Sequence, residues 1–443
     1  MSLTSNFFKF LFYSFPAFMF ASSGYINAYI FFFIIYSFFF FYYNKIKINV
    51  IILDYLIILF FLTCVVSSLL NLNEIKNFNL GVKEFNLEIS AFTKSIFNFR
   101  FFFLYIFVRN VIDKKLVNIK VLSIISLICS VLLSLDIFLQ HLVGFDIFNN
   151  PPFDGRFNGF FEHEAIAGSY LQKFFLLSII SIFILKKNLK SFFLIIFFIN
   201  VFGLGILLSL DRMPYLIFLF SIFVLIIMFN NYRIKLFIIL ILAIFIFQLF
   251  FSNYSIIKNR YLSLAGELEL DRIAKLFINN SSKSSISIIK NNKDDDNLKG
   301  DYLKIYKAAY NVFLESPFLG KGLKSFSYEC KKLRNKNIHI NLTCSTHPHN
   351  IYLEILVYQG VLGLLLFLLF IIILISKNYS NTIFLKIAIE KKILSILFFT
   401  ILISELIPIR SYGSIFQTVN GSIFWFMLSI ISSKIHIPKN KIN

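Results

Sequence analysis

The sequence predicts an all-α polytopic membrane protein with about twelve transmembrane helices. Of its 443 residues, 58% are hydrophobic, and 61 of them are Phe and 21 are Tyr. A soluble globular domain cannot hide this much apolar surface. Apolar runs of about 20 residues, the length that crosses the hydrocarbon core of a bilayer, recur along the chain. The apolar composition and the recurring apolar runs together exclude a soluble protein.

The expected spans follow one another from the N-terminus, with one long interruption. They lie near residues 7–23, 27–43, 50–70, 95–112, 118–143, 165–185, 191–209, 214–230, 236–253, 350–376, 392–409 and 420–432. The first has no small-residue cleavage site, so we interpret it as a retained span rather than a signal peptide. Three regions result: residues 1–253 with spans 1–9, a large loop at 254–349, and residues 350–443 with spans 10–12 and a tail.

The formal net charge of +20 sets the expected orientation in the membrane. In a soluble protein it would suggest nucleic acid as a partner. Here the basic residues gather in short alternate loops, for example Lys45 and Lys47, or Lys186 and Lys187. Because such loops stay on the cytoplasmic side, we expect both termini in the cytoplasm and the 254–349 loop at the periplasmic face of a bacterial inner membrane. We expect membrane lipids and no nucleic acid as partners.

The long loop is expected to hold one amphipathic helix, over residues 302–314. Four apolar or aromatic side chains fall on one helical face: Leu303, Tyr306, Tyr310 and Phe313. The helix would lie on the outer membrane surface or pack over the transmembrane bundle. The polar stretch 279–296 before it is typical of a flexible tether.

The cysteines predict one disulfide and no metal site. Cys330 and Cys344 lie in the outward loop, where an oxidising periplasm favours a bridge between them; two free thiols are the alternative. Cys64 and Cys129 fall within spans and are typical of small packing residues. No CxxC pair or zinc spacing occurs, so we expect neither a metal nor a cofactor.

Polar side chains within the spans gather near the ends that we expect to face outward. They are Arg100, Asp136, Gln140, His141, Asp211, Arg212, His347, His349, Glu405 and Arg410, with Asp54 as an exception near an inner end. Arginines at span ends often only reach out to the interface. The clustering at one leaflet favours a shared polar cavity open to the periplasm, because ionisable groups inside a membrane are costly and usually functional.

The residue types in this cavity fit one chemistry. Arg156 and Arg212 carry permanent positive charges with planar donors that suit phosphate oxygens. Near neutral pH, His349 can accept a proton from an attacking hydroxyl. Positive side chains can stabilise a diphosphate leaving group in place of a metal ion. We therefore expect transfer of a sugar from a lipid diphosphate to a hydroxyl.

Four short motifs carry a family resemblance. Gly155-Arg156 with Gly159, the segment 208–212 and the segment 308–322 precede His349-Asn350, which is followed after nine residues by Gly360-Val361-Leu362-Gly363. This last pattern resembles the H-N-x9-G-x-x-G signature of bacterial O-antigen ligases. The two arginine segments and the region before the signature also resemble that family over roughly residues 150–370. The wider superfamily holds O-antigen polymerases and O-linked protein oligosaccharyltransferases.

The resemblance implies a GT-C-like fold and a metal-independent, inverting glycosyltransferase. It implies a polyprenyl (undecaprenyl) diphosphate-linked glycan as donor, and lipid A-core or a growing glycan as acceptor. His349 would be the catalytic base, and Arg156 and Arg212 would bind the diphosphate. Supporting roles fall to His347, Asn350, Asp211, Arg100, Gly360 and Gly363. Asp211 stands where the family often has Ser and could pair with Arg212.

The ligase is the first hypothesis, and alternatives stay open. A polymerase or an O-linked protein oligosaccharyltransferase would use the same donor chemistry. A transporter of lipid-linked glycans, from a different class, is expected to carry polar groups near the membrane midplane and repeat symmetry between its halves. The sequence has neither feature.

Overall fold

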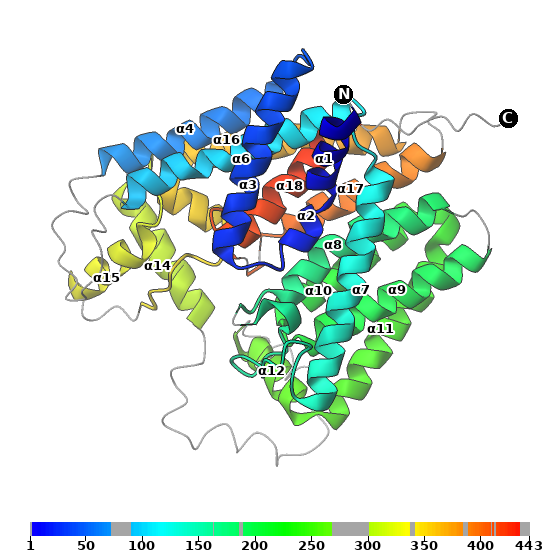
Figure 1. Ribbon diagram of the computed structural model, residues 1–443. Helices are drawn as coiled ribbons and strands as arrows, with labels where there is room; N and C mark the ends of the chain where they lie inside the picture. The colour runs from blue at the N-terminus through cyan, green and yellow to red at the C-terminus, as the bar shows by residue number, and fades with distance from the viewer. Residues whose placement is uncertain are drawn as a thin grey trace, which may run out of the picture. The chain divides into compact units, whose positions relative to one another are not determined.

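The computed structural model describes residues 2–71, 90–162, 164–185, 189–267, 301–336, 342–383, 389–408, 410–411 and 413–434. Within these residues every regular element is a helix, and the only β pairing is an isolated bridge between Phe153 and Arg156 (Figure 1). The all-α prediction is confirmed. The tether expected at 279–296 and residues 435–443 of the tail lie outside the described residues.

The helices follow the apolar segments that hydropathy predicts. In order they are α1 (Ser2–Tyr13), α2 (Phe15–Phe18), α3 (Ser23–Tyr43), α4 (Ile52–Leu70), α6 (Ser90–Asp113), α7 (Ile119–Val143), η2 (Gly159–Phe161), α8 (Ala167–Leu185), α9 (Leu189–Leu208), α10 (Arg212–Met228), η3 (Asn230–Tyr232), α11 (Arg233–Asn253), α12 (Ser255–Glu267), α14 (Asp301–Glu315), α15 (Phe326–Lys336), α16 (Ile351–Ile383), α17 (Ile389–Glu405) and α18 (Thr418–Ser432).

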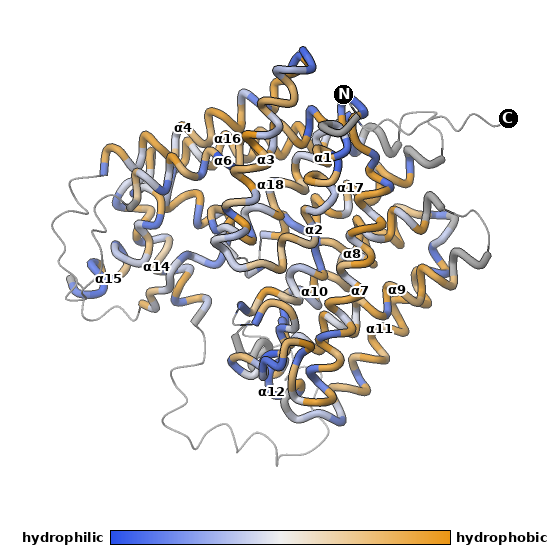
Figure 2. Tube along the Cα trace, viewed as in Figure 1, coloured by the Kyte–Doolittle hydropathy of each residue, from blue (hydrophilic) through white to orange (hydrophobic). Residues whose placement is uncertain are grey.

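Six described helices are long and apolar enough to cross a membrane: α3, α4, α6, α7, α11 and α16. Four further apolar helices are shorter, namely α8, α9, α10 and α18. Figure 2 shows how consistently apolar α11 is, and most of its side chains are not covered by other parts of the chain. An uncovered apolar helix suits contact with lipid. The chain is a polytopic membrane protein, and the number twelve stays a prediction.

The first expected span is two helices rather than one. α1 ends at Tyr13, and α2 begins at Phe15 with Pro16 in its first turn. Proline has no amide hydrogen, and its ring clashes with the carbonyl of the residue four positions earlier, so a straight helix cannot continue through it. Hydropathy alone did not reveal this interruption within 7–23.

The described residues form two compact units. The first comprises Met1–Leu62, Lys94–Phe247 and Leu365–Asn443, and the second comprises Thr63–Thr93 and Gln248–Leu364. The boundaries between them fall inside α4, α6, α11 and α16, so each of these helices contributes residues to both units.

The first unit is built on α7, α8 and α9, which pack side by side (Figure 1). The backbone of α9 comes close to α7 at Gly205, where a Cβ atom would lie 2.7 Å from the hydroxyl oxygen of Ser134. Small residues allow such close packing of helices in membranes. α10 and α17 pack on α8 and on each other. α8 is therefore the most enclosed helix, and the site residues near its N-terminus have a rigid support.

The second unit contains α12, α14 and α15, and α14 packs against both of the others. The packed face of α14 is formed by Ile305, Ala308, Ala309 and Val312. Of the predicted apolar face, Leu303 and Tyr310 are 43% and 54% exposed. The small alanines allow close packing, so the packed face lies one step around the helix from the one that periodicity predicts.

Candidate active site

Arg156 is presented by a tight turn in the first unit. The amides of Phe153 and Arg156 donate to each other's carbonyl oxygens at 3.1 and 2.9 Å, and Asp154 and Gly155 between them have φ angles of 50° and 65°. A two-residue turn of type I′ needs positive φ at both central positions, and Asp-Gly is a favoured pair there. The local sequence therefore fixes where the arginine leaves the backbone.

An ion pair joins the two arginine-bearing segments. Nη1 of Arg156 lies 3.1 Å from Oδ1 of Asp211, whose Oδ2 accepts a hydrogen bond of 3.1 Å from the amide of Gly168. Asp211 is 6% exposed and Arg156 is 28% exposed. A Cβ atom on Gly168 would lie 2.5 Å from Oγ of Ser209, so only glycine allows α8 to begin this close to the junction. The pairing that the structure describes for Asp211 is thus with Arg156.

Arg212 starts α10 directly after Asp211. The side chain of Asp211 makes no capping hydrogen bond to this helix, since its oxygens meet Arg156 and Gly168. The first amides of α10 and the helix dipole favour an anion at this end. Arg156 and the N-terminus of α10, whose first residue is Arg212, therefore meet at one junction. Such a junction suits the phosphate groups of a ligand.

Three polar residues near the C-terminal end of α7 hold the loop that carries Arg156. Asp136 accepts from the amide of Ile147 at 2.8 Å, and Gln140 accepts from the amide of Gly159 at 3.1 Å. The ring of His141 meets the ring of Phe157 edge-on, with 5.0 Å between the centroids. Asp136, Gln140 and His141 therefore support the loop that carries Arg156.

A second cluster of polar side chains lies about one turn further along α8. Arg410 donates to Glu405 at 3.1 Å and to Gln172 at 2.7 Å, and Lys173 donates to Asn420 at 3.2 Å. All three charged side chains of this group are buried. It joins α8, α17 and the start of α18. Arg100, on α6, is not part of it or of the Arg156–Asp211 contact.

In the second unit, His349 stands immediately before α16. Oδ1 of Asn350 accepts from the amides of Tyr352 at 3.0 Å and Leu353 at 3.2 Å, the pattern of a helix N-cap. His349 itself has a φ of 55°, a left-handed conformation that L-residues rarely adopt. Strained backbone of this kind often occurs at functional sites. Capping by Asn350 thus fixes the helix start and the position of His349.

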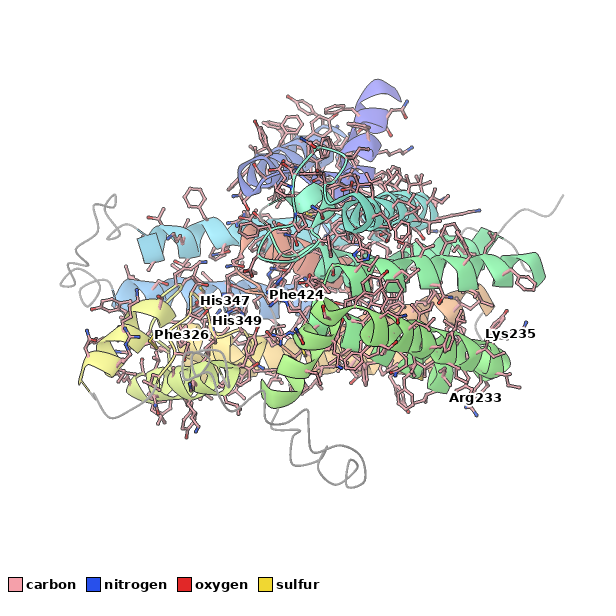
Figure 3. The ribbon with its side chains drawn as sticks, turned by 90° about the horizontal axis from the view of Figure 1, so that it is seen from below. Arg233, Lys235, Phe326, His347, His349 and Phe424 are labelled. Atoms are coloured by element: carbon pink, nitrogen blue, oxygen red, sulfur yellow. A yellow bond between two sulfur atoms is a disulfide. The ribbon has the colours of Figure 1, made fainter. Side chains whose placement is uncertain are left out.

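The imidazole of His349 is enclosed by three neighbours. Its Nε2 lies 2.9 Å from Oγ of Ser345. Figure 3 labels His347 and His349 close together, and their ring centroids are 4.0 Å apart. The ring of Tyr302 from α14 meets His349 edge-on, with 5.6 Å between the centroids. Nδ1 of His347 pairs with Oγ1 of Thr346 at 3.0 Å.

Burial sets the charge of this site. Loss of solvent lowers the pKa of His349 to about 4, so the imidazole is neutral at pH 7 and has a free nitrogen lone pair. Burial also raises the pKa of Tyr306 to about 12, an effect that its hydrogen bond with the side chain of Asn350 partly offsets. A neutral imidazole beside hydroxyl groups can accept a proton from a hydroxyl.

A disulfide anchors the histidine segment. Cys330 on α15 is bonded to Cys344, with 5.6 Å between the Cα atoms. Cys344 directly precedes Ser345, so the bridge fixes one end of the segment 345–350 and the start of α16 fixes the other. The histidine segment is therefore restrained at both ends.

The glycines after the histidines let another stretch of backbone pack closely against α16. α16 is broken at Gly360, which has φ 64° and ψ −163°. The loop after α14 enters this break: the amide of Lys321 donates to the carbonyl of Val357 at 2.8 Å, and the amide of Val361 donates to that of Pro317 at 2.8 Å. A Cβ atom on Gly360 would overlap the carbonyl of Phe318.

Close approach at this break extends over neighbouring positions. A Cβ atom on Gly320 would overlap the backbone of Gln359, and one on Gly363 would meet the side chain of Gln359. The hydroxyl of Ser67 on α4 donates to the carbonyl of Tyr358 at 2.8 Å. The glycines thus hold the loop, α4 and α16 together below the histidine segment.

A family model described as O-antigen ligase matches residues 192–368. This part of the chain is therefore similar to the O-antigen ligase family, as the short motifs predict. The match runs from α9 to the middle of α16, and it includes the first residue of α10, both histidines and the glycine break. A comparison with curated proteins found no match.

The predicted site residues fall into two groups. The first unit brings Arg156, Asp211 and Arg212 to one junction, whereas the second unit brings His347, His349 and Asn350 to one segment. Residue-based prediction missed two neighbours of His349. Ser345 could have been found from its place four residues before His349, but Tyr302 comes from a distant helix and carries no local signal.

Proposed function

We propose that the protein is a glycosyltransferase that moves a glycan from a polyprenyl (undecaprenyl) diphosphate to a hydroxyl of lipid A-core, at the periplasmic face of the bacterial inner membrane. The match of residues 192–368 to the O-antigen ligase family supports a ligase- or polymerase-type membrane enzyme. The observation that carries the proposal is the neutral, buried imidazole of His349, whose Nε2 lies 2.9 Å from a hydroxyl oxygen. That is the distance at which a base meets an acceptor hydroxyl.

In the proposed reaction, His349 takes the proton of the acceptor. The acceptor hydroxyl replaces Ser345 as the hydrogen-bond partner of Nε2. As the acceptor oxygen attacks the anomeric carbon of the sugar, the bond from that carbon to the diphosphate breaks, and the hydroxyl proton passes to the imidazole. Attack from the side opposite the leaving group inverts the anomeric centre.

The leaving diphosphate is the role proposed for the arginine junction. Arg156 is held by Asp211 and stays 28% exposed, so part of its guanidinium is open to a ligand. Arg212 and the first amides of α10 add donors at the same place. Positive groups fixed in advance stabilise the charge that develops on a leaving diphosphate, and this supports a reaction without a metal ion.

Substitution of the base tests the mechanism. We expect His349→Ala to lower transfer of glycan from undecaprenyl diphosphate to lipid A-core by at least about 100-fold, the usual contribution of a general base. The measurement is a transfer assay with purified protein, with Arg334→Ala, an exposed change on α15, as the control. Transfer at the wild-type rate by a well-folded His349→Ala protein would refute this mechanism.

Deletion of the gene separates ligase from polymerase. For a ligase, we expect lipid A-core to lose all of its glycan while full-length chains stay on the lipid carrier. A lipid A-core that carries a single repeat unit would instead identify a polymerase. Unchanged surface glycan with loss of glycan from secreted proteins would identify an O-linked protein oligosaccharyltransferase.

A further inference from the structure

Helix α6 carries two buried arginines, and their surroundings differ. Arg109 is fully buried and donates to Asp54 at 2.6 Å and to Asp113 at 2.9 Å. Its charge is met by two carboxylates of the chain itself. Arg109 therefore has a structural role that joins α6 to α4.

Arg100, on the same helix, has no such neutralisation. It is 9% exposed, and in the part of the chain that the structure describes no carboxylate pairs with it. Its Nη1 donates to the carbonyl of Phe97 at 3.0 Å, and its guanidinium lies 4.3 Å from the centre of the Phe101 ring. Its buried Nε has no hydrogen-bond partner.

A permanent charge in this position calls for an anion from outside the chain. Guanidinium does not lose its proton in proteins, so Arg100 cannot become neutral as a buried Lys could. A carbonyl oxygen and an aromatic face meet only part of the charge. Ionisable groups inside a membrane that lack a partner in their own chain usually serve a ligand or a substrate pathway.

The neighbourhood indicates which kind of anion. Ile96, Phe97 and Phe103 on α6 are exposed apolar side chains, and the ring of Phe97 meets the ring of Phe31 on α3 edge-on at 6.1 Å between centroids. The carbonyl that accepts from Arg100 belongs to this same Phe97. A ligand for this place needs an anionic group for the arginine and an apolar chain for the aromatic surface.

We propose that Arg100 binds a phosphate group of a membrane-embedded lipid whose hydrocarbon chain lies on the α3–α6 surface formed by Phe31, Ile96, Phe97 and Phe103. The planar donors of Arg suit phosphate oxygens. The lipid is an anionic phospholipid, because the diphosphate of the polyprenyl carrier is already assigned to Arg156 and Arg212. The inference therefore does not rest on the proposed function.

Binding to the purified, lipid-depleted full-length chain in detergent tests this assignment. The probes are undecaprenyl diphosphate without glycan and phosphatidylglycerol, each titrated against wild type, Arg100→Leu, Arg100→Lys and Lys94→Gln. We expect Arg100→Leu to weaken binding of phosphatidylglycerol at least tenfold, Arg100→Lys to weaken it less, and Lys94→Gln to leave it within twofold, while all three variants bind undecaprenyl diphosphate like wild type. Lys94 is the matched control because it is an exposed cation on the same helix.

The probe that responds identifies the source of the phosphate. Loss of phosphatidylglycerol binding alone supports the phospholipid site. Loss of undecaprenyl diphosphate binding would make Arg100 part of the carrier site and would overturn the inference, as would unchanged binding of phosphatidylglycerol to folded Arg100→Leu. Where the leucine variant does not fold, Arg100→Gln, which also removes the charge, replaces it.

The melting temperature separates binding from a structural role. A binding arginine is held without its ligand at a cost, so we expect lipid-free Arg100→Leu to melt no lower than wild type while it loses the rise that the lipid produces. A lower melting temperature of the lipid-free variant would show a structural role and overturn the inference. The measured quantity is lipid binding and not glycan transfer, so a failure of the proposed transfer reaction would leave this result intact.

Discussion

At the scale of single residues, His349 combines strong positioning with weak basicity. Ser345, His347 and Tyr302 enclose the imidazole, and the left-handed backbone at His349 places it outside the helix that follows. Burial keeps the ring neutral, at the expense of its affinity for a proton. A weak base suffices if the proton leaves late, because the acceptor hydroxyl becomes acidic as its oxygen bonds to the anomeric carbon.

This environment predicts an unusual pH profile. Because the pKa of His349 is lowered to about 4, the base stays in its neutral, active form from pH 7 down to about pH 5. An exposed histidine, with a pKa of about 6.5, would be mostly protonated at pH 5. We expect kcat/KM for glycan transfer to fall only below about pH 5, as measured in buffers of constant ionic strength. A midpoint near 6.5 would contradict the burial that the structure shows.

The same shift affects stability with a defined sign. The unfolded chain binds a proton at His349 below about pH 6.5, and the folded chain binds it only near pH 4. Folding is therefore favoured above this window and is weakened as the pH falls through it. The site is suited to a neutral environment.

At the scale of elements, the break in α16 positions α14, the helix whose side chains contact the histidine segment. The loop after α14 binds the exposed carbonyl of Val357, and the hydroxyl of Ser67 binds that of Tyr358. α14 in turn supplies Tyr302 and the hydroxyl of Tyr306 to the histidine segment. The spacing between His349 and Gly360 therefore links the imidazole to the break in α16 at which the loop after α14 docks.

Gly360→Ala tests the role of this break. The φ and ψ of Gly360 are nearly exclusive to glycine, and a Cβ atom would overlap the carbonyl of Phe318. We expect a loss of about 1–3 kcal/mol in stability, together with reduced transfer, measured by thermal unfolding and the transfer assay. Gly24→Ala is the matched control, because no atom lies within 4 Å of its added Cβ and Ala favours the helix α3. Equal melting temperatures for the two variants would contradict the role of the break.

Helix positions could be predicted from the sequence, but their interruptions could not. Apolar runs give each helix within a few residues, because the bilayer demands both length and apolarity. The breaks at Pro16 and Gly360 depend on other facts. Pro16 interrupts the helix through its own ring, which hydropathy does not record. Gly360 breaks α16 where a loop from about 40 residues earlier docks, which no local pattern records.

At the scale of the whole molecule, the site residues could be named from the sequence, but their partners could not. The signature around His349 and the two arginine segments were visible as short motifs. The Arg156–Asp211 pair joins residues far apart in the chain, whereas the sequence alone indicated only that Asp211 could pair with its neighbour Arg212. Likewise, Tyr302 reaches His349 from a helix that periodicity located but oriented differently. Contacts between distant segments follow from packing, which no local pattern records.

The orientation of the whole chain in the membrane can be tested through its four cysteines. Cys330 and Cys344 form the disulfide, and Cys64 and Cys129 are free and buried in α4 and α7. A disulfide persists only where the compartment is oxidising, so the proposed periplasmic position of α15 and the histidine segment predicts an intact bridge in cells. After denaturation in a thiol-reactive mass tag, we expect two tags per chain without reduction and four after reduction. Four tags without reduction would place this segment in the reducing cytoplasm and would reverse the topology, together with the side of the membrane on which His349 acts.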